Sequence, residues 1–252
     1  MAWTINYVNK PKLNTPLLIE GMPGIGNVGK IVADMLVDQL KAKKLADIYG
    51  RKLPNSVFVN EENLVELPSI ELFYARAGKQ DVIILSGDAQ PIDEESCYEF
   101  CETVLEHAKR IGTTQLITLA GIGLSESPMK SQTFCTGTDK KFIEELAKAG
   151  ANPKIHGKVG PILGVSGLLL GVGARHGFKT ASLLSETYAH PLHAGFEGAK
   201  SSLAVLAKYL GIKFDYVALD EAIKEIRNAP ETESKLETIN KLKSYKETTY
   251  IG

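Results

Sequence analysis

The segment Gly24–Lys30 has the residue types and the spacing of a phosphate-binding loop. Gly24, Gly26 and Gly29 fit the dinucleotide fingerprint G-x-G-x-x-G, and Asp47 lies in the next expected strand. The same segment also matches the start of a P-loop, G-x-x-x-x-G-K, in which backbone amides surround the phosphates and the lysine supplies positive charge. Either chemistry would make the chain a nucleotide-binding protein.

Both nucleotide patterns are incomplete. Ile31 stands where a P-loop has the serine or threonine that binds magnesium. Asp47 belongs to a segment that is followed by further strands, whereas a dinucleotide-binding half needs a helix there. We therefore interpret the glycines as a turn that lets a helix start close against a strand, and we expect no cofactor. A nucleotide-binding enzyme that uses Gly24–Lys30 stays as the alternative hypothesis.

A second group of reactive side chains is Glu186, His190 and His193, which follow an expected strand at residues 181–185. Ligands of α/β sheets usually bind beyond the carboxyl ends of the strands. One carboxylate and two imidazoles could bind a metal or act as acid and base. Pro191 prevents the two histidines from sharing a helix face, and no second carboxylate is close in sequence. We favour a loop with surface histidines and expect no metal.

Ser166 lies between glycines but does not complete the G-x-S-x-G nucleophile motif, because Leu168 takes the place of the last glycine. We expect no catalytic serine, and we interpret residues 159–174 as buried loops and strand in which Gly167 serves close packing. The three cysteines are expected to be reduced: Cys97 and Cys101 lie in a helical pattern, and Cys135 lies in a polar loop.

The elements that would position these residues alternate between strand and helix. Hydrophobic runs predict strands at residues 17–19, 45–49, 57–59, 64–67, 70–75, 81–86, 116–119 and 181–185. Helical periodicity predicts helices at residues 28–40, 96–111, 139–149 and 197–210. The runs 81–86 and 116–119 flank a helix and predict a parallel βαβ unit. The fold class is therefore α/β.

The sequence changes character after Gly211. Residues 220–245 are densely charged and predict two short amphipathic helices that are separated by Pro230. We expect an α/β core domain at 1–212 and a C-terminal arm and tail at 213–252. The narrow apolar stripe suits docking on a neighbouring protein, and packing of the first helix on its own domain stays open as the alternative.

The overall charge excludes some classes of partner. The chain has 252 residues, of which 29 are Lys or Arg and 30 are Asp or Glu, and the formal net charge is −1. Such a chain has no long-range field that would attract nucleic acid or anionic lipid, so we expect neither partner. The N-terminus has no basic region followed by an apolar run, which indicates a cytoplasmic protein without a signal peptide.

Four blocks stand in order along the chain: GMPGIGNVG at 21–29, GIG at 121–123, GVSGLLL at 164–170 and LLSET at 183–187. Together they resemble the proteasome assembly chaperone family over roughly residues 15 to 210. The resemblance implies a three-layer α/β/α sandwich with a mostly parallel mixed sheet, like that of purine nucleoside phosphorylases but without enzymatic activity. It also implies a homo-oligomer that binds proteasome α subunits. The family motif falls on Gly24, Gly26, Asn27, Gly29, Gly167, Glu186 and Thr187, for which we expect structural roles.

In archaeal members, the resemblance implies a C-terminal tail with a hydrophobic-Tyr-any ending that inserts between α subunits. Here Tyr250 is followed by Ile251 and Gly252, and Thr249 stands where a hydrophobic residue is expected. A tyrosine is a rigid amphipathic anchor, and a terminal carboxylate can be captured by a lysine or by backbone donors. We therefore hypothesise a non-enzymatic assembly chaperone whose tail binds its partner. A tail without a partner, and a homo-oligomeric scaffold for another protein client, stay open as alternatives.

Overall fold

The computed structural model describes residues 3–60, 62–191 and 193–228 of the chain. Its main sheet has eight strands: β1 (Trp3–Tyr7), β2 (Leu17–Gly21), β3 (Lys43–Gly50), β6 (Ile70–Ala77), β7 (Gln80–Gly87), β8 (Gln115–Leu124), β9 (Thr133–Gly137) and β10 (Lys179–Tyr188). The helices are the short 3-10 turn η1 (Ile25–Asn27), α1 (Val28–Gln39), α2 (Glu94–Arg110), α3 (Lys140–Lys148), α4 (Gly164–Arg175), α5 (Phe196–Leu210) and α6 (Val217–Asn228). A separate hairpin consists of β4 (Phe58–Val59) and β5 (Val65–Glu66).

The sheet is mixed, with a parallel centre. Its strand order is β1-β3-β6-β7-β2-β8-β10-β9. The neighbours β7, β2, β8 and β10 run parallel to one another, whereas β6, β3 and β1 on one side and β9 on the other pair antiparallel. The carboxyl ends of the four parallel strands therefore meet at one edge, where the glycine loop follows β2 and where Glu186 lies near the end of β10.

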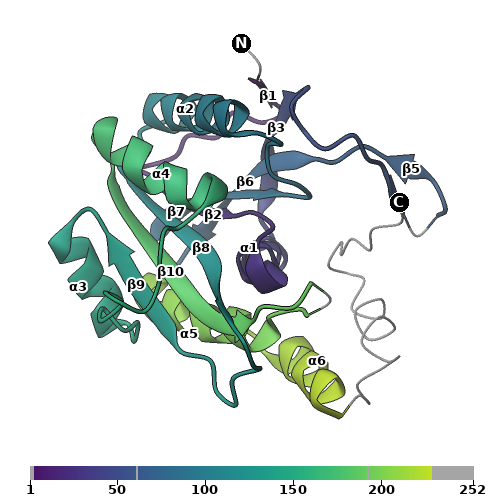
Figure 1. The fold of residues 1–252 in the computed structure, drawn as a ribbon. Helices are drawn as coiled ribbons and strands as arrows, with labels where there is room; N and C mark the ends of the chain where they lie inside the picture. Colours follow the sequence, from purple (N-terminus) through teal and green to yellow (C-terminus); the bar gives the residue numbers. More distant parts are fainter. Residues whose placement is uncertain (1–2, 61, 192, 229–252) are drawn as a thin grey trace.

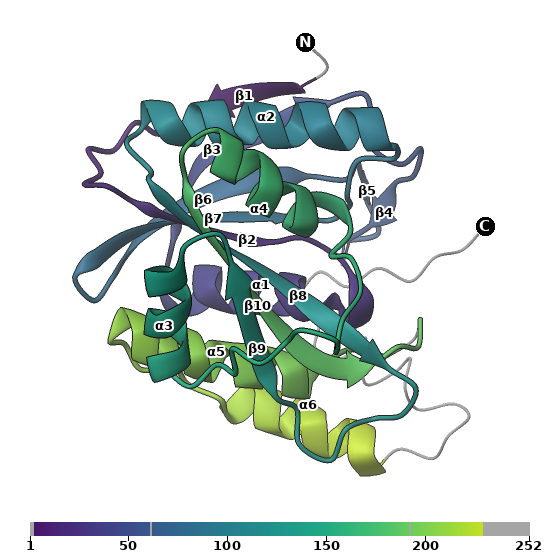
Figure 2. The same ribbon diagram turned by 60° about the vertical axis from the view of Figure 1, so that its left-hand side comes forward.

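Helices cover both faces of the sheet, as Figure 2 shows. Helices α2 and α4 lie on one face, and α1, α3, α5 and α6 lie on the other. Neighbouring residues of β2 point into different cores, because side chains alternate along a strand: Leu18 belongs to the core that contains Phe100 of α2, and Ile19 belongs to the core that contains Val32 of α1. The three-layer α/β/α arrangement that the family resemblance implies is confirmed.

Two local expectations were wrong. Residues 164–175 form helix α4, not loops and strand, because tertiary packing outweighs the low helix propensity of glycine. A Cβ atom on Gly173 would lie 2.9 Å from Cγ2 of Thr180, so this glycine lets α4 approach the sheet. Cys135 lies in β9 and is buried, not in a polar loop, and its thiol contacts the carbonyl oxygen of Ile143 at 3.8 Å. Cys97 and Cys101 are also free and buried.

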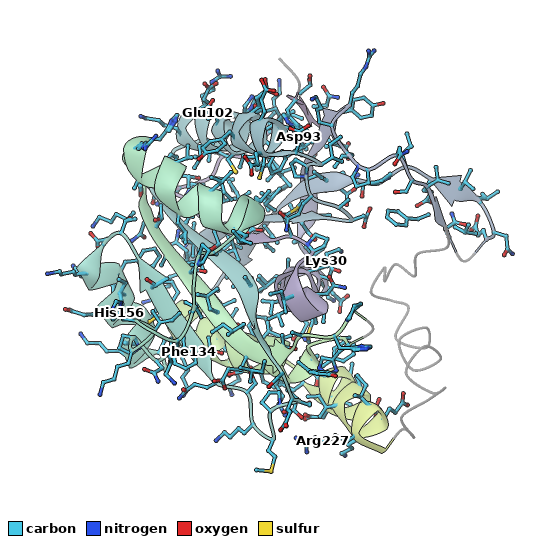
Figure 3. The ribbon with its side chains drawn as sticks, viewed as in Figure 1. Lys30, Asp93, Glu102, Phe134, His156 and Arg227 are labelled. Carbon is cyan, nitrogen blue, oxygen red and sulfur yellow. The ribbon has the colours of Figure 1, made fainter. Side chains whose placement is uncertain are left out.

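Helix α6 packs against α5 of the same chain, which is one of the two arrangements left open for this helix. Leu219 and Ala222 are buried in the core beneath α5. Arg227 donates a hydrogen bond of 2.9 Å to Glu197 of α5, and Figure 3 shows it at the far end of α6. The helix expected after Pro230 and the tail at 250–252 lie outside the described residues, and the domain boundary after residue 212 stays a prediction. No helix in the described ranges is long and apolar enough to cross a membrane.

Candidate functional site

The glycine loop joins β2 to α1 and crosses the carboxyl ends of β8 and β10. A Cβ atom on Gly29 would lie 2.2 Å from the carbonyl oxygen of Leu119 in β8. A Cβ atom on Gly121 would lie 2.3 Å from the carbonyl oxygen of Ile25. Real Cβ atoms do not approach backbone oxygens so closely, so both contacts require glycine. The loop is packed directly on the backbone of the sheet.

Two amides of this loop donate hydrogen bonds to carbonyl oxygens of the loop itself. The Asn27 amide donates to the carbonyl oxygen of Gly24 at 2.9 Å, and the Val28 amide donates to that of Ile25. The carbonyl oxygen of Gly26 accepts a hydrogen bond of 2.7 Å from the amide of Gly195. A phosphate cradle needs several loop amides that point into an open concavity. These hydrogen bonds use the loop for internal packing and argue against such a cradle.

Lys30 is neutralised by its own helix. Its ammonium group lies 2.5 and 2.7 Å from the two carboxylate oxygens of Asp34, and Asp34 also accepts a 2.9 Å hydrogen bond from Ser86. Figure 3 shows Lys30 on α1. The lysine borders a surface cavity of about 310 Å³ whose other charged lining residues are all acidic: Asp34, Asp38, Glu71 and Asp88. Excess negative charge repels phosphate, so this cavity does not suit a nucleotide.

Thr187 joins the glycine loop to the start of α5. Its Oγ1 atom would lie 2.7 Å from a Cβ atom on Gly26 and also 2.7 Å from one on Gly195. Thr187 is buried, and Oγ1 has no hydrogen-bond partner among the described residues. The structure therefore brings Thr187 together with Gly26 and Gly121, which are both far from it in sequence. The adjacent cavity under α6 has a volume of only about 30 Å³, which is room for a water molecule or two.

Strand β10 extends to Tyr188 and thus includes Glu186, and this residue and the two histidines after the strand do not converge on a common point. The Glu186 carboxylate accepts a hydrogen bond of 3.1 Å from the amide of Gln132. The rings of His190 and His193 contact Tyr188, each with a centroid separation of 5.5 Å; His190 is stacked and His193 is edge-on. Within the described ranges, no group of three His, Cys, Asp or Glu residues is arranged to hold a metal ion.

Two polar residues, one fully buried and one partly buried, were missed by the sequence reasoning. Glu20 of β2 is fully buried, and its Oε1 atom accepts hydrogen bonds from the amide of Met22 at 3.0 Å and from Ser166 at 3.1 Å. Burial raises the pKa of this carboxyl group to about 8, and these hydrogen bonds oppose the rise. Ser166 thus donates to a buried carboxyl group. The position of a glutamate inside the apolar run 17–21 could have predicted a buried carboxyl group from the sequence.

Gln90 is the second missed residue, and it connects three segments. Its Nε2 atom donates to the carbonyl oxygen of Pro23 at 2.5 Å, and its Oε1 atom accepts from the amide of Val165 at 3.0 Å. The side chain thereby joins the glycine loop, the segment after β7 and the start of α4. Gly167 lies in that helix, where a Cβ atom would lie 1.9 Å from the carbonyl oxygen of Ile162. Polar and backbone groups of the protein itself fill this end of the sheet.

Comparisons with known proteins agree over most of the chain. Residues 18–232 match the model of the PAC2 family. The crystal structure of Pyrococcus furiosus PbaB, described as an archaeal proteasome activator, is 30% identical and has a TM-score of 0.83 over 96% of this chain and 99% of that chain. PbaA of the same organism, described as an archaeal homolog of proteasome-assembly chaperone, is 24% identical with a TM-score of 0.74 over 95% of this chain and 93% of that chain. An uncharacterized protein of Methanocaldococcus jannaschii is 26% identical over 225 residues, which are 89% of this chain and 85% of its own.

Proposed function

Because this chain belongs to the PAC2 family, we propose that it is a non-enzymatic chaperone of the proteasome that binds proteasome α subunits. The similarity to PbaB over almost the whole length of both chains carries the proposal. An activator and an assembly chaperone must both dock on the proteasome, so the two descriptions of the similar proteins lead to the same class of partner.

The C-terminal tail is the part of the chain that we propose to make this contact. Tyr250, Ile251 and Gly252 end the sequence with one aromatic anchor, one aliphatic side chain and a terminal carboxylate. A tyrosine buries a large apolar ring while its hydroxyl group finds a polar partner, and a carboxylate is recognised by a lysine or by backbone amides. A pocket between two α subunits would have to supply an apolar surface for the tyrosine ring, a polar partner for its hydroxyl group, and a lysine or backbone amides for the carboxylate.

The absence of enzymatic activity is proposed on the geometry of the glycine loop. The loop amides of Asn27 and Val28 donate within the loop, and Lys30 is paired with Asp34. The rival hypothesis, a nucleotide-binding enzyme, requires these groups to be available for phosphate. Isothermal titration calorimetry of the full chain with ATP, NAD and nucleosides tests it. Saturable heat at micromolar ligand would support the enzyme and overturn our proposal for the loop.

The interaction itself is tested by native gel electrophoresis with recombinant α subunits and, separately, with assembled core particles of the same organism. We expect the full chain to co-migrate with at least one of the two. Co-migration with free α subunits indicates an assembly chaperone, and co-migration with core particles alone indicates an activator. If neither binds, the proposal fails, and affinity capture from a native lysate then tests the rival of another protein client.

The contribution of the tail is tested by Tyr250→Ala, with Tyr245→Ala as the matched control because it removes a second tyrosine from the same end of the chain. Loss of one anchoring aromatic side chain should weaken binding by more than about 30-fold, which corresponds to about 2 kcal/mol. The control should bind like the unaltered chain. Equal binding by both variants would remove the tail from the proposal but leave the partner in place.

A further inference from the structure

The hairpin β4–β5 projects from the body of the protein, as Figure 1 shows. It interrupts the path from β3 to β6, and in the described part of the chain its two strands pair only with each other. The turn is ordered by Asn60, whose side-chain oxygen accepts hydrogen bonds from the amides of Glu62 at 3.0 Å and Leu64 at 2.9 Å. The hairpin is therefore a defined structure with two open edges.

One face of this hairpin is entirely aliphatic. Val59 pairs with Val65, and the same register places Val57 opposite Leu67. Because side chains alternate along a strand, these four residues share a face. They are exposed by 53% (Val57), 67% (Val59), 67% (Val65) and 64% (Leu67). Glu66 belongs to the other face, where it accepts a hydrogen bond from Asn60 at 2.8 Å. We call the four residues the aliphatic face.

An isolated two-stranded hairpin is marginally stable in water and needs packing against a further layer. The aliphatic face is covered by none of the described residues to any great extent, since each of its side chains is more than half exposed. The protein that covers the aliphatic face must therefore be present whenever this chain is folded. A second copy of the same chain meets this requirement without any other component.

The chemistry of the face also favours a second copy. It contains only Val and Leu, without the arginine and aromatic residues that are enriched in contacts between different proteins. Permanent contacts between identical chains are more hydrophobic and resemble a core cut in half. Two uncharged faces can meet across a two-fold axis without repulsion, and they can pack as two sheet layers do in a β-sandwich.

The aliphatic face supplies most of the apolar area that such a contact needs. Each half-exposed aliphatic side chain offers roughly 100 Å², so the four together offer about 400 Å² per copy. A standard interface buries about 800 Å² per partner, of which about 500 Å² is apolar. Ile92 extends the apolar surface at the base of the hairpin: it is 57% exposed, and its amide donates to the carbonyl oxygen of Lys52.

We propose that the aliphatic face of the β4–β5 hairpin docks on the same face of a second copy of this chain. The inference goes beyond the proposed function, and it rests on the exposure, the apolar composition and the pairing of the four residues of the aliphatic face. It does not depend on the identity of the client, because the contact forms in the purified protein alone.

The test is the mass of the purified full chain, measured by sedimentation velocity over a series of concentrations. The double variant Val59→Glu, Val65→Glu places four carboxylates at the contact, and we expect at least a 100-fold weaker association and a lower mass. Met129→Glu, Val217→Glu is the matched control, since these apolar residues are 94% and 60% exposed elsewhere and lie outside the hairpin. The control should keep the mass of the unaltered chain.

A cross-link locates the contact independently. Val59→Cys adds an exposed thiol to a chain whose three own cysteines are buried, so mild oxidation should give a covalent dimer with a single bridge. A monomeric unaltered chain at all concentrations would overturn both the homo-oligomer and the inference. An oligomer that survives Val59→Glu, Val65→Glu would overturn the surface alone. Faster thiol labelling of Val59→Cys after deletion of residues 229–252 would show that this segment covers the face, which would also overturn it.

Discussion

The buried carboxyl group of Glu20 should make the stability of this protein depend on pH in a range where most proteins vary little. Burial raises its pKa from an ordinary value of 4.5 to about 8. Between these two values the folded state keeps a proton that the unfolded state has released. The free energy of unfolding therefore decreases as the pH rises above about 4.5, and the decrease is complete above about 8.

The informative perturbation is Glu20→Gln. Glutamine is neutral at every pH, and its oxygen can keep the hydrogen bonds from Met22 and Ser166 that Oε1 of Glu20 accepts. The two pKa values correspond to a maximum effect of about 5 kcal/mol, at about 1.4 kcal/mol per pH unit. The variant should therefore match the unaltered protein near about pH 4.5 and be more stable by several kcal/mol near about pH 9.

The assay is urea unfolding of both proteins at constant ionic strength, at intervals between about pH 4.5 and about pH 9. Glu102→Gln makes the same chemical change at an exposed position on α2, which Figure 3 labels, and serves as the control. The difference between Glu20→Gln and the unaltered protein should grow with pH, whereas the control should show no comparable growth. If the free energies of unfolding of Glu20→Gln and of the unaltered protein change with pH in parallel, the pKa of Glu20 is not raised in the folded state.

Two further predictions concern the glycine loop and its surroundings. Gly29→Ala should lower the free energy of unfolding in urea by about 3 kcal/mol or more, because the new Cβ atom would lie 2.2 Å from the carbonyl oxygen of Leu119. Gly24→Ala should have a small effect, because no atom lies within 4 Å of a Cβ atom at this position. Equal losses of stability in the two variants would contradict the close packing of the loop on β8. Thr187→Val should change stability by less than about 1 kcal/mol because Oγ1 has no partner among the described residues. Thr133→Val should lower the free energy of unfolding by about 1–3 kcal/mol, because the Thr133 hydroxyl group lies 2.7 Å from the hydroxyl groups of both Ser185 and Ser201. Similar thermal midpoints for Thr187→Val and Thr133→Val would contradict these hydrogen-bond assignments.

The sequence predicted the elements whose pattern is local. The hydrophobic run 81–86 corresponds to β7, because a strand that is buried on both faces consists of consecutive apolar residues. The periodic segment 28–40 corresponds to α1, because a helix that is buried on one face has apolar residues at helical spacing. The family resemblance drawn from the glycine blocks is confirmed by the match to residues 18–232. The clustering of Gly26 with Thr187 could not be read from spacing, because it depends on the order of strands in the sheet.

The errors have a common physical origin in tertiary packing. Helix α4 contains four glycines, at least two of which serve close approaches, so local propensity pointed to loops. Strand β9 is short and lies at the edge of the sheet, and burial of Cys135 beside α3 follows from its pairing with β10. Gln90 has no local signal, because its two hydrogen bonds join segments that are 67 and 75 residues away.

The order of strands in the sheet has a consequence for how the chain folds. Strand β2 is made early, at Leu17–Gly21, but it pairs with β7 from residue 82 and with β8 from residue 116. Strand β8 in turn pairs with β10, which starts at residue 179 and is therefore synthesised later. During synthesis the apolar residues of β2 therefore remain without their neighbours until well over a third of the chain has emerged. Parallel pairing over such separations is slow and exposes apolar strands to aggregation, so we expect refolding in milliseconds to seconds or longer and a marked dependence of its yield on protein concentration.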